Sequence, residues 1–194
     1  MKIFLAVLLF FFTLQSLSKS DDISEFEIEG MTIGNSLLDH FTETEIKDNQ
    51  YSLTQIKDKK YLKINLENLK NVEIYDRLSA TFKSSDKKYK TTSIEGIVWY
   101  KDDISTCLKK RDEIILTLSD LFKNLDNEDI KQKHFLDNES FTHDYYIFFQ
   151  NKDNWPVDHI LVSCYDWSDK LEFRDHLRIA IVSKEYMAWL ENLN

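Results

Sequence analysis

The sequence predicts an α+β fold, in which antiparallel β-sheet packs against one long central amphipathic helix and short terminal helices. Three observations predict this class. The segment 103–125 has the apolar periodicity of a single helix. Several other segments are rich in aromatic and β-branched residues, which is typical of strands. Most connections between these strands are short, which favours antiparallel pairing.

The first elements predicted are a short strand, a turn and a short helix. Apolar and acidic residues alternate over 25–29, which indicates a half-buried strand. Asn35 or Ser36 can cap a short helix over 37–41. The next segment, 42–60, is polar, and we expect a helix tail followed by a loop.

A further strand is predicted at 61–66, followed by a β-hairpin. The runs 73–83 and 89–101 are rich in aromatic and β-branched residues, and the polar segment 84–88 separates them. Gly96 within the second run indicates a bulge or a close contact.

The clearest helix in the sequence is 103–125. At 100° per residue, its apolar side chains fall within an arc of about 140°, and most of its charged residues lie outside that arc. Asp102 or Asp103 can accept hydrogen bonds from free N–H groups in the first turn. The apolar stripe includes Cys107.

Strands also dominate the second half of the chain. The segment 124–138 is charged and irregular, which predicts a linker between two halves. Strands are predicted at 143–150, 158–165 and 177–183. Ser183 can cap a final short helix.

Residues 1–20 have the layout of a secretory signal peptide. Lys2 supplies a positive start, and 3–14 is an almost unbroken apolar run. That run is short for a membrane span, which needs about 20 residues, so cleavage is favoured over an uncleaved anchor. Ser18 and Ser20 suit the −3 and −1 positions of a cleavage site. We expect cleavage after Ser20, with cleavage after Ser18 as the alternative.

The remaining chain, 21–194, is expected to form a single α+β domain. It is long enough for one substantial core. Because of the linker prediction, a division into two lobes, 21–125 and 139–194, is the alternative.

The composition is acidic and poor in glycine. The full chain has 25 basic and 34 acidic residues and a net charge of −9, which becomes −11 once Lys2 and Lys19 leave with the signal peptide. Such a surface repels phosphate backbones and anionic lipids, so nucleic-acid binding is excluded. The 3 glycines match no phosphate loop and no nucleophile elbow. We expect no cofactor, and no membrane-embedded segment after signal cleavage.

The two cysteines, Cys107 and Cys164, are predicted to form a disulfide that joins the helix to a strand. Closing a loop of this size stabilises the fold by about 4 kcal/mol in the chain-entropy account. The alternative makes Cys107 a nucleophile, with its pKa lowered at the helix N-terminus and a histidine as base.

Two pairs of residues form a weak candidate site. Asp166 and Trp167, with Asp169 and Glu172 nearby, have the acids and the aromatic ring that sugar-cleaving enzymes place around a substrate, although a polar turn explains them as well. His143 and His159 lie on strands that can pair, which would bring them together. No histidines have metal-ligand spacing. The sequence therefore predicts no catalytic residue and no metal site.

Three segments carry a resemblance to known proteins. They are FEIEGMTIGNSLL (26–38), IEGI (94–97) leading to Cys107, and SCYDW (163–167). Together they resemble a family of uncharacterised small exported proteins of marine bacteria with reduced, AT-rich genomes. The opening segment alone also resembles β-lactamase-inhibitor-like and outer-membrane-assembly lipoprotein modules, which bind proteins. The lipoprotein cysteine of those assembly proteins is missing here.

These features favour a soluble periplasmic or secreted protein without catalytic activity. The resemblance implies a protein-binding module whose partner is another envelope protein. One alternative is an exported hydrolase that acts through Asp166 and Trp167 or through His143 and His159. The other is a small-ligand-binding protein that uses the aromatic strands. The oligomeric state does not follow from the sequence.

Overall fold

The computed structural model describes residues 22–52, 59–67, 74–101, 103–134 and 136–193. The predicted signal peptide lies outside these residues. The strands are β1 (Gln50–Ser52), β2 (Tyr61–Glu67), β3 (Arg77–Lys83), β4 (Thr91–Trp99), β5 (Asp126–Lys133), β6 (Phe141–Phe148), β7 (His159–Asp166) and β8 (His176–Val182).

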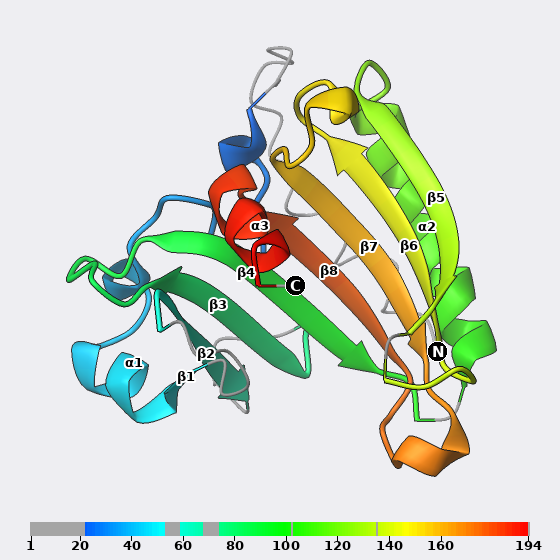
Figure 1. Cartoon of the computed structure of the whole chain (residues 1–194), viewed down its shortest axis with the longest axis horizontal. Coiled ribbons are helices and arrows are strands. Elements are labelled where there is room, and N and C mark those ends of the chain that lie inside the picture. Colours follow the sequence, from blue (N-terminus) through cyan, green and yellow to red (C-terminus); the bar gives the residue numbers. More distant parts are fainter. Residues whose placement is uncertain (1–21, 53–58, 68–73, 102, 135, 194) are drawn as a thin grey trace.

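All of these strands belong to one antiparallel sheet in the order β1-β2-β3-β4-β8-β7-β6-β5. β1 and β5 form its two edges, and the sheet twists strongly between them (Figure 1). The sheet therefore contains strands from both predicted lobes. The α+β class with antiparallel pairing is confirmed.

The described residues form three α-helices, α1 (Glu43–Asn49), α2 (Ile104–Leu121) and α3 (Lys184–Glu191), and four short 3₁₀ segments. Asp103 caps α2 by accepting from the Thr106 N–H at 3.0 Å, and Ser183 caps α3. Both predicted caps are confirmed. In the described part of the chain, no helix is long and apolar enough to cross a membrane.

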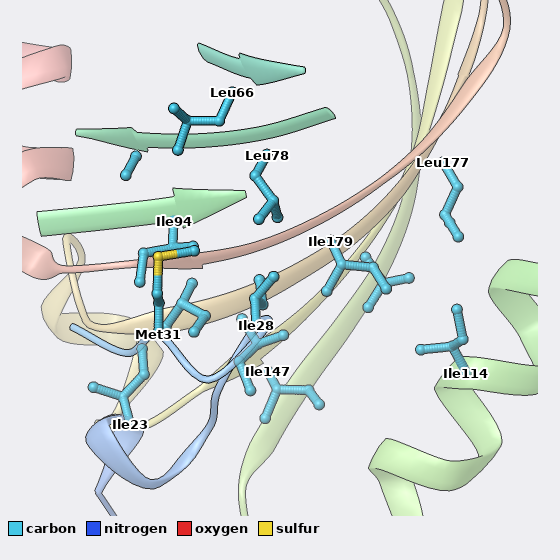
Figure 2. Close-up of a cluster of buried hydrophobic side chains, with 14 of the residues drawn as sticks. Ile23, Ile28, Met31, Leu66, Leu78, Ile94, Ile114, Ile147, Leu177 and Ile179 are labelled. Atoms are coloured by element: carbon cyan, nitrogen blue, oxygen red, sulfur yellow. The ribbon is translucent and has the colours of Figure 1, made fainter. Parts of the chain in front are cut away.

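α2 and α3 lie on opposite faces of the sheet (Figure 1). α2 packs mainly on β7 and β8, and Arg111 reaches β6 by donating to the His143 carbonyl, so α2 covers only part of its face. The N-terminal segment joins the same core through Ile28 and Met31 (Figure 2). Leu177, Ile179 and Ile181 of β8 point into this core, as their alternation predicts.

A disulfide joins α2 to β7 within this core. Cys107 and Cys164 are bonded, with their Cα atoms 6.1 Å apart, and both side chains are fully buried. The bond leaves no thiol at Cys107 for the alternative role as nucleophile.

Near the N-terminus, the strand predicted at 25–29 is wrong. Ile23–Glu25 is a 3₁₀ turn, and Ile28 pairs only with Met31 in an isolated bridge. Gly30 has a φ of +74°, so the chain reverses before a strand can form. Within 42–60, the helix and loop expectation missed the short strand β1.

The linker predicted at 124–138 is also wrong, because most of it is the edge strand β5. Seven of its eight residues are exposed, so the strand carries no apolar alternation. Backbone pairing with β6 holds it in place. At Gly96, the predicted close contact is confirmed, because a Cβ there would lie 2.4 Å from the ring of Tyr75.

Candidate functional site

The face of the sheet that carries α3 is lined largely by polar and aromatic side chains. α3 covers one end of it, where Tyr186 and Trp189 pack on Tyr61 and Leu161. The functional candidates lie on the same face. They fall into a buried charged group and a cluster of aromatic rings.

The charged group is centred on Glu95 of β4, which is 5% exposed. Arg178 of β8 approaches it with Nε 2.6 Å from Oε2, and Lys63 of β2 donates to its other oxygen. Burial by itself would raise the pKa of Glu95, but Arg178 and Lys63 lower it to about 2. Burial opposes the charge of Lys63 and lowers its pKa. The carboxylate is therefore held ionised by cations and is not available as an acid or base.

The second group, here called the aromatic cluster, gathers rings from β4, β7, β8 and two connecting segments. Its members are Trp99, His134, Tyr165, Trp167, Phe173 and His176. Tyr165 and His176 are stacked, with ring centroids 4.4 Å apart. His134 meets Trp167 at 4.4 Å, and Phe173 meets Trp167 at 5.0 Å. Arg178 donates to the Tyr165 hydroxyl at 3.1 Å, which connects the cluster to the charged group.

Arginines and backbone contacts fix the orientation of the cluster. The guanidinium of Arg77 lies 4.8 Å from the centroid of Trp99, and that of Arg174 lies 6.0 Å away. Asp76 accepts from the Trp99 backbone N–H at 2.7 Å. Asp175 similarly accepts from the Trp167 N–H at 2.9 Å.

His176 is neutral under physiological conditions. Burial lowers its pKa to about 4, although the carbonyl of Arg174, 2.9 Å from Nδ1, works in the opposite direction. Arg178 and Arg77 add to the lowering. The imidazole is enclosed by rings and bound to a backbone carbonyl, so it serves as part of the cluster rather than as a proton carrier.

An open hollow of about 340 Å³ adjoins the cluster. Its lining mixes aromatic, cationic and acidic side chains, namely Lys101, Trp167, Ser168, Asp169, Glu172, Phe173 and Arg174. Phe173 is 51% exposed, which is high for a phenylalanine. The hollow and the rings beside it form a surface that combines aromatic and charged side chains.

No known relative identifies this surface. Neither a protein-family model, nor a curated protein, nor a solved structure matches the chain. Among the described residues, no group of three or more His, Cys, Asp and Glu side chains is placed to hold a metal ion.

Of the residues singled out from the sequence, Trp167 belongs to the aromatic cluster. Asp166 ends β7 next to it and pairs with Phe141. The strands of His143 and His159 do pair, but the register separates the two side chains. His143 lies opposite Cys164, whereas His159 lies opposite Phe148. An odd offset of five residues places the two imidazoles on opposite faces of the sheet, far apart.

Sequence reasoning missed most of the cluster. Trp99, Tyr165 and His176 come from strands that lie side by side in the order β4, β8, β7. Trp99 lies directly opposite His176, and His176 lies opposite Tyr165. Trp99 and Tyr165 lie at or near the C-terminal ends of their strands, and His176 lies at the N-terminal end of its strand. Because neighbouring strands are antiparallel, these three ends meet at one end of the sheet. Recognising this signal in the sequence requires the strand order.

A buried acid on the same face is also fully occupied. Asp144 of β6 accepts hydrogen bonds from Thr142 and Gln132 at 2.8 Å each, and also from Ser163. These bonds explain how a carboxylate is tolerated in a buried position. Like Glu95, Asp144 has a structural role, because its carboxylate bonds to other side chains of the protein.

Proposed function

We propose that this protein is an exported, non-catalytic binding module that recognises another envelope protein through the aromatic cluster. The observation that carries the proposal is the gathering of partly exposed Trp, Tyr, Phe and Arg side chains at one end of the sheet. Tryptophan, tyrosine and arginine dominate the energetics of protein–protein interfaces.

The cluster is already ordered before any partner arrives. Asp76 and Asp175 hold the backbone at Trp99 and Trp167, and Arg77 lies against the Trp99 ring. Side chains that are fixed in advance lose little conformational entropy on binding. In this proposal, α2 acts as the central support, because it backs β7 and β8 from the opposite face.

The chemistry of the hollow suggests what the partner presents. An apolar or aromatic side chain of the partner would stack on Trp167 and Phe173. Lys101 and Arg174 would donate hydrogen bonds to carboxylate or carbonyl groups of the partner. The charges of Asp169 and Glu172, which also line the hollow, would repel a second carboxylate.

A periplasmic or secreted location is part of the same proposal. The bond between Cys107 and Cys164 fits an oxidising compartment, where such bonds form and persist. The carboxylates of Glu95 and Asp144 are occupied by ion pairs and hydrogen bonds within the protein, which supports binding rather than catalysis on this face.

Substitution of Phe173 tests the proposal. The mature protein, its Phe173→Ala variant and its Leu116→Ala variant are each used to capture proteins from the organism's own envelope extract. Leu116 lies on α2 and is 74% exposed, so its variant is a matched control far from the cluster. We expect a partner retained by the parent and by Leu116→Ala, and reduced about tenfold by Phe173→Ala.

The same captured set from all three proteins would overturn the proposal. Photo-crosslinking from position 173 gives a second readout, because it records contact at the cluster directly. Circular dichroism of each variant verifies that the fold is intact.

Binding of a small ligand is the second candidate, and the hollow is the observation that favours it. Trp167 beside Asp169 and Glu172 offers a ring face and two acceptors, which suits a neutral sugar. Titration with a panel of neutral oligosaccharides, followed through tryptophan fluorescence, tests this candidate. A saturable change that Phe173→Ala removes would favour it over a protein partner.

A further inference from the structure

The outer edge of β5 has no neighbouring strand in the described part of the chain. β5 is eight residues long, and all of its residues except Ile130 are exposed. It lies at the margin of the sheet (Figure 1). A long, open edge is a template for another strand, and natural proteins usually protect it.

The register shows which backbone groups face outward. The His134 N–H donates to the Ser140 carbonyl at 2.9 Å, on the continuation of the β5–β6 ladder. Hydrogen bonding alternates along an antiparallel strand, so the even-numbered residues of β5 bond to β6. The odd-numbered residues, including Asp129 and Lys131, therefore point their N–H and C=O groups away from β6.

We propose that two copies of this chain pair through β5, antiparallel and with Ile130 facing Ile130 across a twofold axis. In this register Asp129 lies opposite Lys131 of the second copy, and Lys131 lies opposite its Asp129. Both residues carry outward N–H and C=O groups, so these opposed residues form the hydrogen-bonded pairs. Glu128 lies opposite Gln132, and Asn127 opposite Lys133.

The charge pattern selects this register over its two nearest neighbours, since an axis at Lys131 would oppose two lysines. A shift of the axis to Asp129 would oppose two aspartates at the centre. Registers intermediate between these three would oppose residues from different faces of the sheet, which the pleat forbids. Charges normally protect an edge strand, but here their order along β5, acidic and then basic, makes the edge complementary to itself.

The other elements leave room for this pairing. α2 packs mainly on β7 and also reaches β6, where Arg111 Nε donates to the His143 carbonyl at 2.9 Å, so it lies against one face of the sheet and not in the plane of the β5 edge. Arg111 of α2 reaches Asp129 and pairs with one of its carboxylate oxygens. The Asp129 side chain is 60% exposed, so Lys131 of the other copy can approach it.

Sedimentation velocity over a range of concentrations tests the pairing. We expect a reversible dimer for the parent protein. Lys131→Glu places acids opposite Asp129 at two equivalent positions, which should weaken the dimer at least about tenfold. Lys87→Glu, in the exposed β3–β4 connection, makes the same charge change away from the edge and should leave the dimer intact.

A cysteine crosslink tests the register and does not depend on charge. In the proposed dimer, the two Ile130 residues form a non-hydrogen-bonded pair with Cα atoms about 4.5 Å apart. Ile130→Cys should therefore form a disulfide between copies under mild oxidation. Glu128→Cys should not, because its twin lies four residues away, roughly 13 Å.

A parent protein that is monomeric at every concentration would overturn the inference. So would equal crosslinking at positions 128 and 130. Neither result tests binding at Phe173, which lies in the β7–β8 connection, so the two proposals fail separately.

Discussion

Glu95 is the residue whose burial matters most for the polar face of the sheet. It is almost inaccessible and lies between Lys63 and Arg178. A buried charge is tolerated only with partners, and each of these charges depends on the others. The pKa of Glu95 is low because Arg178 and Lys63 stabilise its ionised form.

Replacing Glu95 with glutamine should therefore destabilise the protein strongly. The change leaves the partly buried cations Lys63 and Arg178 without their shared counterion, which costs about 3 kcal/mol in the free energy of unfolding. Urea denaturation measures this loss. Glu43→Gln is the matched control, because Glu43 forms an exposed ion pair with Lys47 and should change stability little. Equal effects of the two substitutions would contradict the assigned role of Glu95.

His176 makes the fold sensitive to acid. Its pKa is about 4 in the folded protein, against 6.5 for an unperturbed histidine. Above pH 6.5 both states are neutral at this residue. Between pH 6.5 and pH 4 only the unfolded chain binds the proton, so stability falls as the pH falls.

The loss expected from His176 is on the order of 3 kcal/mol across that window. Phe in place of His176 keeps a ring against Tyr165 but cannot bind a proton. The His176→Phe variant should therefore show a flatter dependence of unfolding free energy on pH between 6.5 and 4. A slope identical to that of the parent would show that another group controls the acid response.

At the scale of elements, α2 and β7 are joined covalently. The disulfide between Cys107 and Cys164 closes a loop with a sequence separation of 57 residues. Replacing both cysteines with alanine should lower the free energy of unfolding by about 4 kcal/mol, mainly because the unfolded chain gains freedom. Thermal unfolding of the double variant, and of the parent after reduction, measures this. A loss below about 1 kcal/mol would mean that packing alone holds α2 on the sheet.

Elements with strong local signals were predictable. The apolar stripe and Asp103 defined α2, and the alternation in β8 placed its buried face. β5 was not predictable, because an exposed edge strand is held by backbone pairing rather than by apolar side chains. The 25–29 segment failed for a related reason, since its alternation lacked a neighbouring strand to pair with.

At the scale of the whole molecule, the strand order determines which side chains meet, and this order could not be predicted from the sequence. The chain places β8 between β4 and β7, and this crossover brings Trp99, His176 and Tyr165 together. Whether His143 and His159 meet also depends on long-range register, and the register between β6 and β7 places them on opposite faces of the sheet. Cysteine pairing was predictable, because only two cysteines exist.

The proposed functions also belong to this scale. The aromatic cluster lies at the end of β4, β7 and β8, while β5 is the outermost strand of the sheet. A twofold dimer through β5 would carry two copies of the cluster on one continuous sheet. Such a dimer would engage a repeated partner with higher avidity than a single copy.

The disulfide also governs what happens when the backbone is cut. The connection between β5 and β6 lies inside the loop closed by Cys107 and Cys164. A protease that cleaves there severs the peptide chain but leaves both fragments covalently attached. The clipped protein therefore stays in one covalent piece while the disulfide is oxidised, and can separate into two fragments only after a reductant reaches the bond.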